Sequence, residues 1–544
     1  MGLSTTTTTI AMVTKRALHP SAARDSTQHL TLLLTLSSSS ITLPPGTHPT
    51  PATKYPSKTH CINVSSRISP TAPRSLIYLP SQRTIYPPYS DQPTPFRQLR
   101  HFYYLSGCDL PDCHLTYDVQ KQKLTLYIPP LDPREVLWTG MPKGKVELME
   151  ELDVDEVRFS DELRADLDEW VSGCYTAGGV VYCLDKKSLP PPPPEAAGMG
   201  LDECALAEQG WGWTAMRGVV IDTAKLLPTI NDCRVCKDSH EISLLRKAIS
   251  ITRRAHISVM DLLRTTHGPN PKRSITTLNE SHLEATFTST CISLHARTQA
   301  YEPIVCSGRN CATLHYTSNS APLAGKQLLL IDAGCEFHNY ASDITRTYPL
   351  SGTWTPAAKA VYDIVDRMQS HCIARTIAGV SWRETHLLAA RLATEGLLSL
   401  GIFHHGSVDQ IFKAGTWEAF FPHGLGHMLG LETHDVEGTS DNDGGYDPHL
   451  PFSSGNSRRG TPEMGTLVNR ILRPNMVLTV EPGIYFCEWI IKPYLSDPKH
   501  MHFIDAEVLE RYWDVGGVRI EDVVLVNEVG RGNEVLSKDI PRGW

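Results

Sequence analysis

The 544-residue sequence lacks several features that mark common protein classes. It has no apolar run near the ~18 residues that a membrane span requires. It has no basic block, and its net charge of −8 gives no support for a nucleic-acid surface. A G-x-S-x-G nucleophile motif and a glycine-rich phosphate loop at a strand-to-helix turn are also missing. We therefore expect a soluble protein that binds neither membrane nor nucleic acid, and neither a serine hydrolase of that type nor a nucleotide-binding fold.

Cysteine density is low for a disulfide-stabilised protein. The fourteen cysteines are scattered over the whole length instead of crowding a short secreted frame. This distribution predicts reduced thiols in an intracellular protein, and we expect a cytoplasmic location. The length exceeds the size at which one hydrophobic core usually stops growing, so the default expectation is two domains.

Residues 1–53 are rich in Ser, Thr and Pro, and we expect this leader to be disordered. Lys15, Arg16 and Arg24 give it a weak resemblance to a mitochondrial transit peptide, and a mis-assigned start is the other alternative to a plain tail. From residue 54 to 232 strands and helices alternate, which predicts a small α/β domain. Residues 233–544 are expected to form a second domain.

Several elements of the first domain can be placed from local patterns. Between Lys58 and Leu76 the sequence is a poor helix former, and five consecutive prolines from Pro190 predict a stiff surface loop. We expect strands at Leu76–Leu79, Phe102–Leu105, Leu124–Ile128 and Glu156–Phe159, and a helix around Leu148–Leu152.

Helix starts are clearer in the second domain. Asp238 and Glu241 form a capping box ahead of apolar residues at helical spacing. Thr355 followed by Pro356 predicts a second helix. A third is expected from Ser381, with Glu384 completing another capping box, to a stop at Gly401.

The stretch from Leu328 to Pro349 organises this second domain. An apolar run ends in Asp332, and a second carboxylate, Asp343, precedes an alternating strand-like segment. If a hairpin folds about Phe337–His338, the two aspartates lie at mirror positions with Cβ atoms about 5 Å apart. Such a pair must share a proton or bind cations. From this stretch alone, two unrelated turn aspartates are an equal alternative.

Further polar residues interrupt apolar segments downstream. His423, His427 and His434 lie among glycines, which favour close backbone approach over packing. Glu481 and Glu521 occur in strand-like runs, and alternation puts Arg519 on the same face as Glu521. Carboxylates in such runs are rarely buried unless paired or bound to metal. Four carboxylates with at least one imidazole indicate two divalent cations, and this oxygen-rich set suits Mn²⁺.

The sequence resembles the Xaa-Pro aminopeptidase and prolidase family, in its fungal type. The motifs are DAGCEFHNYASDITRTYP, HGLGHMLGLETHD, TVEPGIYF and GVRIED, and the resemblance extends from about Lys54 to the C-terminus. It implies an α+β protein, with an N-terminal α/β domain followed by a pita-bread catalytic domain. It also implies a dinuclear manganese site formed by Asp332, Asp343, His427, Glu481 and Glu521.

The same resemblance implies roles for individual residues. Asp343 and Glu521 would bridge both ions, and Glu481 would also be the base that shuttles the proton of the attacking water. His315 would lie at the substrate pocket. His423, His434 and Arg519 would bind the substrate and stabilise the transition state.

The expected activity is that of a metal-dependent hydrolase, an Xaa-Pro aminopeptidase that cleaves the bond before a penultimate proline with a metal-bound hydroxide. A dipeptidase restricted to Xaa-Pro dipeptides shares the ligands and remains open. A non-catalytic pita-bread binding protein and a metal-free creatine-cleaving relative would both lack this ligand set. We also expect a homodimer or higher homo-oligomer. The polar segment 437–473 follows no pattern that we can assign.

Overall fold

A computed structural model describes residues 54–68, 74–174, 178–190, 219–267, 272–436 and 470–542. Lys54–Trp544 form one compact unit. The predicted leader, proline loop and 437–473 segment therefore lie outside the described residues, apart from Pro190 and the last four residues of that segment. No helix in the described part is long and apolar enough to cross a membrane. The thirteen cysteines described there are all free thiols, including Cys233 and Cys236, which have C-x-x-C spacing.

The N-terminal part is a six-stranded mixed sheet with strand order β4-β3-β2-β1-β5-β6. Side chains of β1 alternate between two cores, with Leu76 and Tyr78 on one face and Ile77 and Leu79 on the other. The strands are β1 (Ser75–Pro80), β2 (His114–Asp118), β3 (Lys123–Ile128), β4 (Glu156–Phe159), β5 (Gly179–Tyr182) and β6 (Val219–Asp222). The helices are α2 (Ser57–Ile68), α3 (Arg100–Ser106), α4 (Pro133–Thr139), α5 (Lys145–Glu151), α6 (Leu163–Ser172) and α9 (Leu226–Val235).

Two predictions for this part were wrong. The Phe102–Leu105 run is not a strand but lies in helix α3, which is almost entirely buried and ends at Gly107 in the left-handed conformation. The segment after Lys58, whose composition disfavours a helix, forms helix α2 up to Ile68. The buried residues of this helix include Cys61 and Val64. Tertiary packing of that face outweighs weak intrinsic propensity. The other predicted elements are confirmed, and α9 runs across the predicted domain boundary at Cys233, which stays a prediction.

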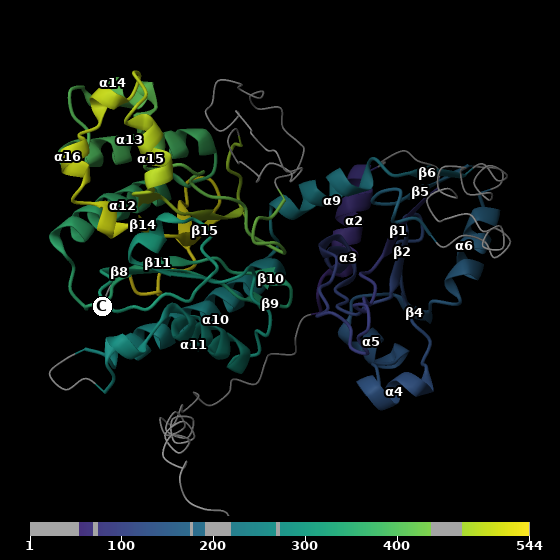
Figure 1. Cartoon of the computed structure of the whole chain (residues 1–544). Coiled ribbons are helices and arrows are strands. Elements are labelled where there is room, and N and C mark those ends of the chain that lie inside the picture. Colours follow the sequence, from purple (N-terminus) through teal and green to yellow (C-terminus); the bar gives the residue numbers. More distant parts are fainter. Residues whose placement is uncertain are drawn as a thin grey trace, which may run out of the picture. The chain divides into compact units, whose positions relative to one another are not determined.

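The C-terminal part places small sheets between helix pairs. Figure 1 shows α10 (Ser239–Arg264) and α11 (Glu280–Ser293) together on one side of β8 (Leu328–Asp332) and β11 (Thr345–Pro349). Their apolar residues share one core with β7 (Ile304–Ser307) and β8. A second core joins α12 (Pro356–Arg375), α13 (Trp382–Ser399) and α14 (Val408–Ala414) to five strands near the C-terminus. Those strands are β12 (Val477–Val480), β13 (Gly483–Tyr485), β14 (Gly517–Arg519), β15 (Asp522–Val526) and β16 (Asn533–Val535).

The helix starts in this part follow the predicted caps. The Asp238 side chain accepts a hydrogen bond from the Glu241 N–H in a complete capping box at α10. Thr355 caps α12, with Pro356 as its first residue. Helix α13 starts where expected, but Ser381 makes no side-chain cap bond, so the second predicted capping box is wrong. Two short helices, α15 (Glu488–Tyr494) and α16 (Ala506–Leu509), lie between β13 and β14.

Candidate metal centre

The hairpin that carries Asp332 and Asp343 turns one residue later than predicted. His338 and Asn339 form the turn with positive φ angles of 48° and 65°. Strands β8 and β11 then pair Asp332 with Thr345, while β9 (Glu336–Phe337) and β10 (Tyr340–Ala341) pair Phe337 with Tyr340. The predicted mirror position of Asp343 was therefore wrong by two residues. A register shift of two residues leaves side chains on the same face of the hairpin, so the prediction that the two aspartates lie close together still holds.

The structure brings the five predicted metal-ligating side chains together. His427 Nε2 lies 3.4 Å from Asp343 Oδ2 and 3.4 Å from Glu481 Oε1. Single donor atoms of Asp343, His427 and Glu521 all lie within 4.8 Å of one another. The Tyr301 hydroxyl lies 2.5 Å from Oδ1 of both Asp332 and Asp343, which connects the fifth side chain to the group.

Electrostatics in this group strongly favour a bound cation. Burial raises the pKa of Asp343 well above its usual range, and repulsion from Asp332 and Glu481 adds to the effect. Burial and the neighbouring carboxylates raise the pKa of Glu481 and of Glu521 in the same way. Divalent ions would remove this repulsion and keep the carboxylates ionised.

The tautomer of His427 also fits a metal ligand. Its Nδ1 lies 3.0 Å from the Met428 carbonyl oxygen, which can only accept, so Nδ1 carries the proton. Burial lowers the pKa of His427, so the ring is neutral and the Nε2 lone pair points toward two carboxylates. A proton donor to a backbone carbonyl on one side and a free lone pair on the other is the usual state of a metal-bound imidazole. The residues present therefore fit divalent metal ions.

Two threonines support the ligands and were missed in the sequence. Thr345 Oγ1 donates to Glu521 Oε2 at 2.8 Å. Thr479 Oγ1 lies 3.2 Å from Glu481 Oε1 and accepts the His427 backbone N–H at 3.0 Å. Each threonine is two residues from a predicted ligand in a strand-like segment, so alternation onto the same face was the signal that could have found it. Tyr301 lies 31 residues before Asp332 and gave no such local signal.

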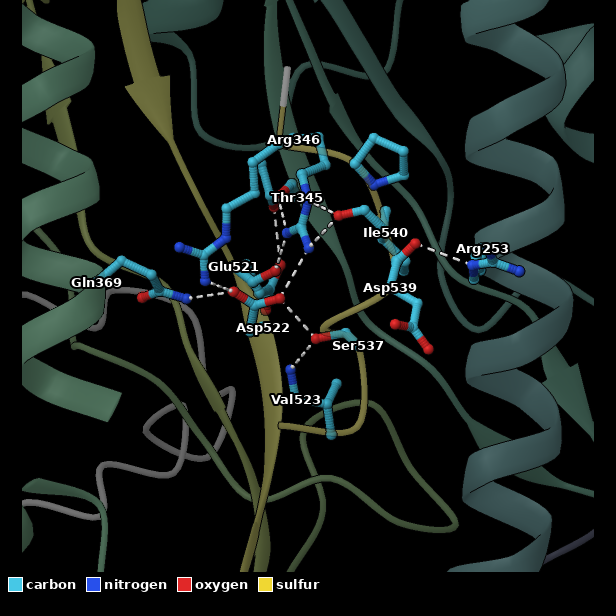
Figure 2. A network of polar contacts seen from close by, with 12 residues as sticks. Arg253, Thr345, Arg346, Gln369, Glu521, Asp522, Val523, Ser537, Asp539 and Ile540 are labelled. Carbon is cyan, nitrogen blue, oxygen red and sulfur yellow. Dashed lines mark hydrogen bonds and ion pairs between the residues drawn. The ribbon is translucent and has the colours of Figure 1, made fainter. Parts of the chain in front are cut away.

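Behind Glu521 lies a buried ion-pair network, which Figure 2 shows. Arg346 Nη2 donates to Asp522 Oδ1 at 2.7 Å, and its Nη1 donates to the Glu521 carbonyl at 2.6 Å. Burial alone would raise the pKa of Asp522, but Arg346 and Arg542 hold it well below its usual range. Gln369 and Ser537 also donate to Asp522, at 3.0 and 2.6 Å. The two arginines therefore favour the charged form of Asp522, and its hydrogen bonds fix the backbone that presents Glu521.

Arg519 connects the centre to the His423 side of the site. Its Nη2 donates to Asp332 Oδ2 at 2.5 Å and its Nη1 to the Tyr485 hydroxyl at 2.9 Å. His423 Nδ1 lies 2.8 Å from the Gly424 carbonyl oxygen and Nε2 lies 2.9 Å from the Tyr485 hydroxyl. Burial and the Arg519 charge lower the pKa of His423 to about 3, so this neutral ring accepts from Tyr485 through Nε2. Both of its nitrogens are therefore already engaged.

His434 and His315 are placed differently. The His434 ring packs against His427 at 4.0 Å between centroids, and the residue is exposed. The described residues give it no hydrogen-bond partner. Loss of hydration and repulsion from His427 and His315 lower the pKa of His434 to about 3. His315 is exposed in the loop after residues 308–312 and is close enough to affect the pKa of both His423 and His434.

Comparison with known proteins places this arrangement in a family. The sequence model for metallopeptidase family M24 matches residues 243–528, and the model for the aminopeptidase P N-terminal domain matches residues 60–177. A "Probable Xaa-Pro aminopeptidase" of Fusarium vanettenii is 44% identical over 88% of this chain and 93% of its own length. A protein of the same name from Tuber melanosporum is 43% identical over 89% of this chain and 94% of its own.

Solved structures agree. Zinc-substituted aminopeptidase P of Escherichia coli in complex with product superposes with a TM-score of 0.66 at 27% identity, over 90% of this chain and 97% of that chain. Proline aminopeptidase P II from Yersinia pestis gives 0.64 at 28% identity, over 89% and 97%. These matches confirm the expected α+β fold, an N-terminal α/β domain followed by a pita-bread catalytic domain. The chain is a hydrolytic enzyme and belongs to metallopeptidase family M24, with the N-terminal domain of the aminopeptidase P proteins.

Proposed function

We propose that this chain is a manganese-dependent Xaa-Pro aminopeptidase that hydrolyses the peptide bond between an N-terminal residue and a penultimate proline. The observation that carries the proposal is the convergence of two carboxylates on the free Nε2 lone pair of His427. The relatives named for this activity share 43–44% of their residues with the chain over nearly their whole length, which supports the same substrate class.

The residues that would hold two manganese ions are Asp332, Asp343, His427, Glu481 and Glu521. Four carboxylates and one imidazole suit Mn²⁺ better than a thiolate-rich zinc set. When bound, such ions lower the pKa of an attacking water and polarise the scissile carbonyl.

The chain's own groups handle the proton and the developing charge. Glu481 takes the proton of the attacking water and passes it to the proline nitrogen as the amide bond breaks. Thr479 orients this carboxylate through its hydrogen bond at 3.2 Å. Arg519 holds Asp332 in place and adds positive charge beside the reacting carbonyl.

The histidines divide the remaining work. The neutral His434 ring has one N–H donor that is not used within the described chain, so it is the group that stabilises the carbonyl oxygen as its charge grows. His423 is neutral and engaged at both nitrogens, so it forms a wall of the proline pocket together with His315. Because the scissile amide of an Xaa-Pro bond has no N–H, such a pocket needs no acceptor for it.

The test is an assay of metal and substrate together. Wild-type protein should contain up to two divalent ions per chain, lose activity on chelation and regain it with Mn²⁺. Asp343→Ala should lose both metal and activity. Asp363→Ala, which removes an exposed carboxylate of α12 paired with Lys359, should lose neither. Wild-type activity in Asp343→Ala, or an active preparation without metal, would refute the metal assignment.

Substrate length decides the finer question. An Xaa-Pro dipeptide should be compared with an Xaa-Pro tripeptide at saturating Mn²⁺. We expect cleavage of the tripeptide. Cleavage of the dipeptide alone would replace the proposal with an Xaa-Pro dipeptidase that uses the same ligands.

We also propose domains at 54–232 and 233–544, a cytoplasmic location and a homodimer or higher homo-oligomer. Leu137 and Trp138 on α4, and Met141 after it, expose 82%, 77% and 72% of their surfaces, which supports an association surface. Sedimentation of wild type and of Trp138→Glu tests the assembly, and cell fractionation tests the location. A wild-type monomer would refute the assembly.

A further inference from the structure

Arg100 in the N-terminal domain reaches both segments that carry the proposed metal ligands. It lies on α3 with only 3% of its side chain exposed. Its Nη2 donates to Glu336 Oε1 at 2.5 Å, and its Nε donates to Glu432 Oε1 at 3.2 Å. Its Nη1 donates to Asn339 Oδ1. One guanidinium therefore holds three acceptors from two parts of the catalytic domain.

These acceptors lie in the two segments that carry four of the histidines and aspartates of the proposed site. Glu336 and Asn339 lie in the hairpin between Asp332 and Asp343, at the end away from the two aspartates. Glu432 lies in the segment between His427 and His434. A backbone bond of 2.8 Å from the Ala341 N–H to the Gly430 carbonyl already joins hairpin and segment at one point. Arg100 adds a second point and so fixes their relative rotation.

Other cations strengthen the same junction. Arg97 Nη2 donates to Glu336 Oε1 at 2.6 Å and to Glu432 Oε2 at 3.3 Å. Next to His434, the buried Asp435 accepts from Arg234 at 2.5 Å and from Lys237 at 3.0 Å. The His427–His434 segment is thus held at Glu432 and next to it at Asp435. The side chains that hold it all come from residues before helix α10.

We propose that Arg100 is a positioning residue for the metal centre, which acts through Glu336 and Glu432 to hold the Asp332–Asp343 hairpin against the His427–His434 segment. This inference rests on the proposed function, because it requires that these segments bind metal. Arg100 contacts none of the five proposed ligands within the described chain, so its effect is on their relative placement.

The direction in which Mn²⁺ affinity changes when Arg100 is replaced distinguishes a positioning role from a purely electrostatic one. A positive side chain near a metal centre repels the incoming cation, so removing its charge would raise Mn²⁺ affinity if charge alone mattered. Loss of a positioning contact should instead lower Mn²⁺ affinity, because the metal-ligating side chains then sample more arrangements before they bind the ion. Groups that hydrogen-bond directly to a metal ligand account for about 10-fold to 100-fold in metal affinity, and Arg100, which acts one contact further away, is expected at the lower end of this range.

The variants are Arg100→Gln and Arg100→Lys, with Arg158→Gln as the matched control. Arg158 also forms ion pairs in the N-terminal domain, with Glu162 at 2.9 Å and Asp166 at 3.1 Å, far in sequence from any ligand. Lysine keeps the charge but cannot reach three acceptors at once. For each protein we would measure Mn²⁺ affinity of the apoprotein, the absorption spectrum with Co²⁺ and the thermal midpoint.

We expect Arg100→Gln to bind Mn²⁺ about 10-fold more weakly and to change the Co²⁺ spectrum, with Arg100→Lys weaker than wild type as well. Arg158→Gln should match wild type. Unchanged or tighter binding by a folded Arg100→Gln protein would overturn the inference. If Arg100→Gln does not fold, Glu432→Gln, which removes a partly exposed partner, should weaken binding, and unchanged binding there would overturn it. Wild-type protein that binds no divalent ion would instead refute the proposed function.

Discussion

At the scale of single residues, the three histidines differ in what their nitrogens already contact. His427 presents a free Nε2 lone pair to Asp343 and Glu481, whereas both nitrogens of His423 are engaged. The single N–H of the neutral His434 ring has no acceptor among the described residues. The same residue type therefore serves as a ligand, a wall and a donor, and only hydrogen-bond geometry separates these roles.

Substitution by alanine should separate the three roles. His427→Ala should lose metal affinity, and excess Mn²⁺ should restore part of the activity. His434→Ala should keep its metal while turnover falls on the order of 10²-fold, as for other lost oxyanion donors. His423→Ala should also keep its metal and lose less turnover. The measurement is metal content and turnover in the same preparation. If His434→Ala loses metal while His427→Ala retains it, the two roles have been exchanged.

The residues of the proposed ligand set could be predicted from the sequence, but the distant contacts of Arg100 and Tyr301 could not. Motifs with strong local spacing pointed to the four acids and one imidazole of the proposed ligand set. Arg100 and Glu336 are 236 residues apart, and nothing local in either stretch predicts that they meet. Tyr301 likewise follows from the fold alone. Sequence patterns report which side chains the chemistry needs, whereas contacts between distant elements need the packed structure.

At the scale of elements, the errors arise where a local pattern fits more than one structure or where packing outweighs it. A four-residue apolar run such as Phe102–Leu105 fits a buried strand and a buried helix equally well, and burial on all sides removes the periodicity that would distinguish them. The hairpin register failed for a related reason, since the left-handed turn residues His338 and Asn339 were not recognised. Longer helices with caps were placed correctly because their pattern is repeated over several turns.

Two glycines between His423 and His427 give a matched pair for testing how closely the backbone approaches strand β12. A Cβ at Gly426 would lie 2.1 Å from the Thr479 carbonyl oxygen, whereas one at Gly424 meets nothing within 4 Å. Gly426→Ala must push the segment away from β12 and should cost roughly 1–3 kcal/mol of stability. Gly424→Ala should be close to neutral. Urea unfolding of both variants measures the difference, and equal free energies of unfolding would contradict the contact.

The junction of α2 with α10 should depend on pH through His60. His60 Nδ1 lies 2.7 Å from the Tyr104 carbonyl oxygen and Nε2 lies 2.9 Å from Asp238 Oδ2, so the ring donates on both sides when it is charged. Burial alone would lower its pKa, but Asp238 and Glu241 raise it above the ordinary value. A raised pKa stabilises the folded state fully below about pH 6.5, and this stability is lost as pH rises through the folded-state pKa.

Comparison of wild type with His60→Gln isolates this contribution. Thermal midpoints should be measured from pH 5 to 9 with chelator present, so that metal binding does not contribute. We expect wild type to lose its advantage over His60→Gln as the pH rises. A difference between the two proteins that stays constant over this range would show that His60 is not charged in the fold.

At the scale of the whole molecule, the two halves depend on each other. The N-terminal sheet contributes no proposed ligand, yet Arg97, Arg100 and His60 contact the catalytic half at buried or partly buried sites. Buried ion pairs of this kind add little net stability but penalise any arrangement that leaves one partner unpaired. We infer that these ion pairs select one placement of the Asp332–Asp343 hairpin relative to the His427–His434 segment.

The last prediction concerns the length of chain that this molecule needs. Lys54–Trp544 form a compact unit, and its first described residue is already anchored, because Lys54 Nζ donates to the Met149 and Leu152 carbonyls at 2.7 and 3.1 Å. A protein that begins at Lys54 should therefore keep the thermal midpoint, metal content and turnover of the full chain. One that begins after α2, at residue 69, removes Cys61 and Val64 from the core together with the His60–Asp238 contact. It should unfold at lower temperature or fail to fold. Loss of folding already on removal of residues 1–53 would mean that the N-terminal domain needs the leader.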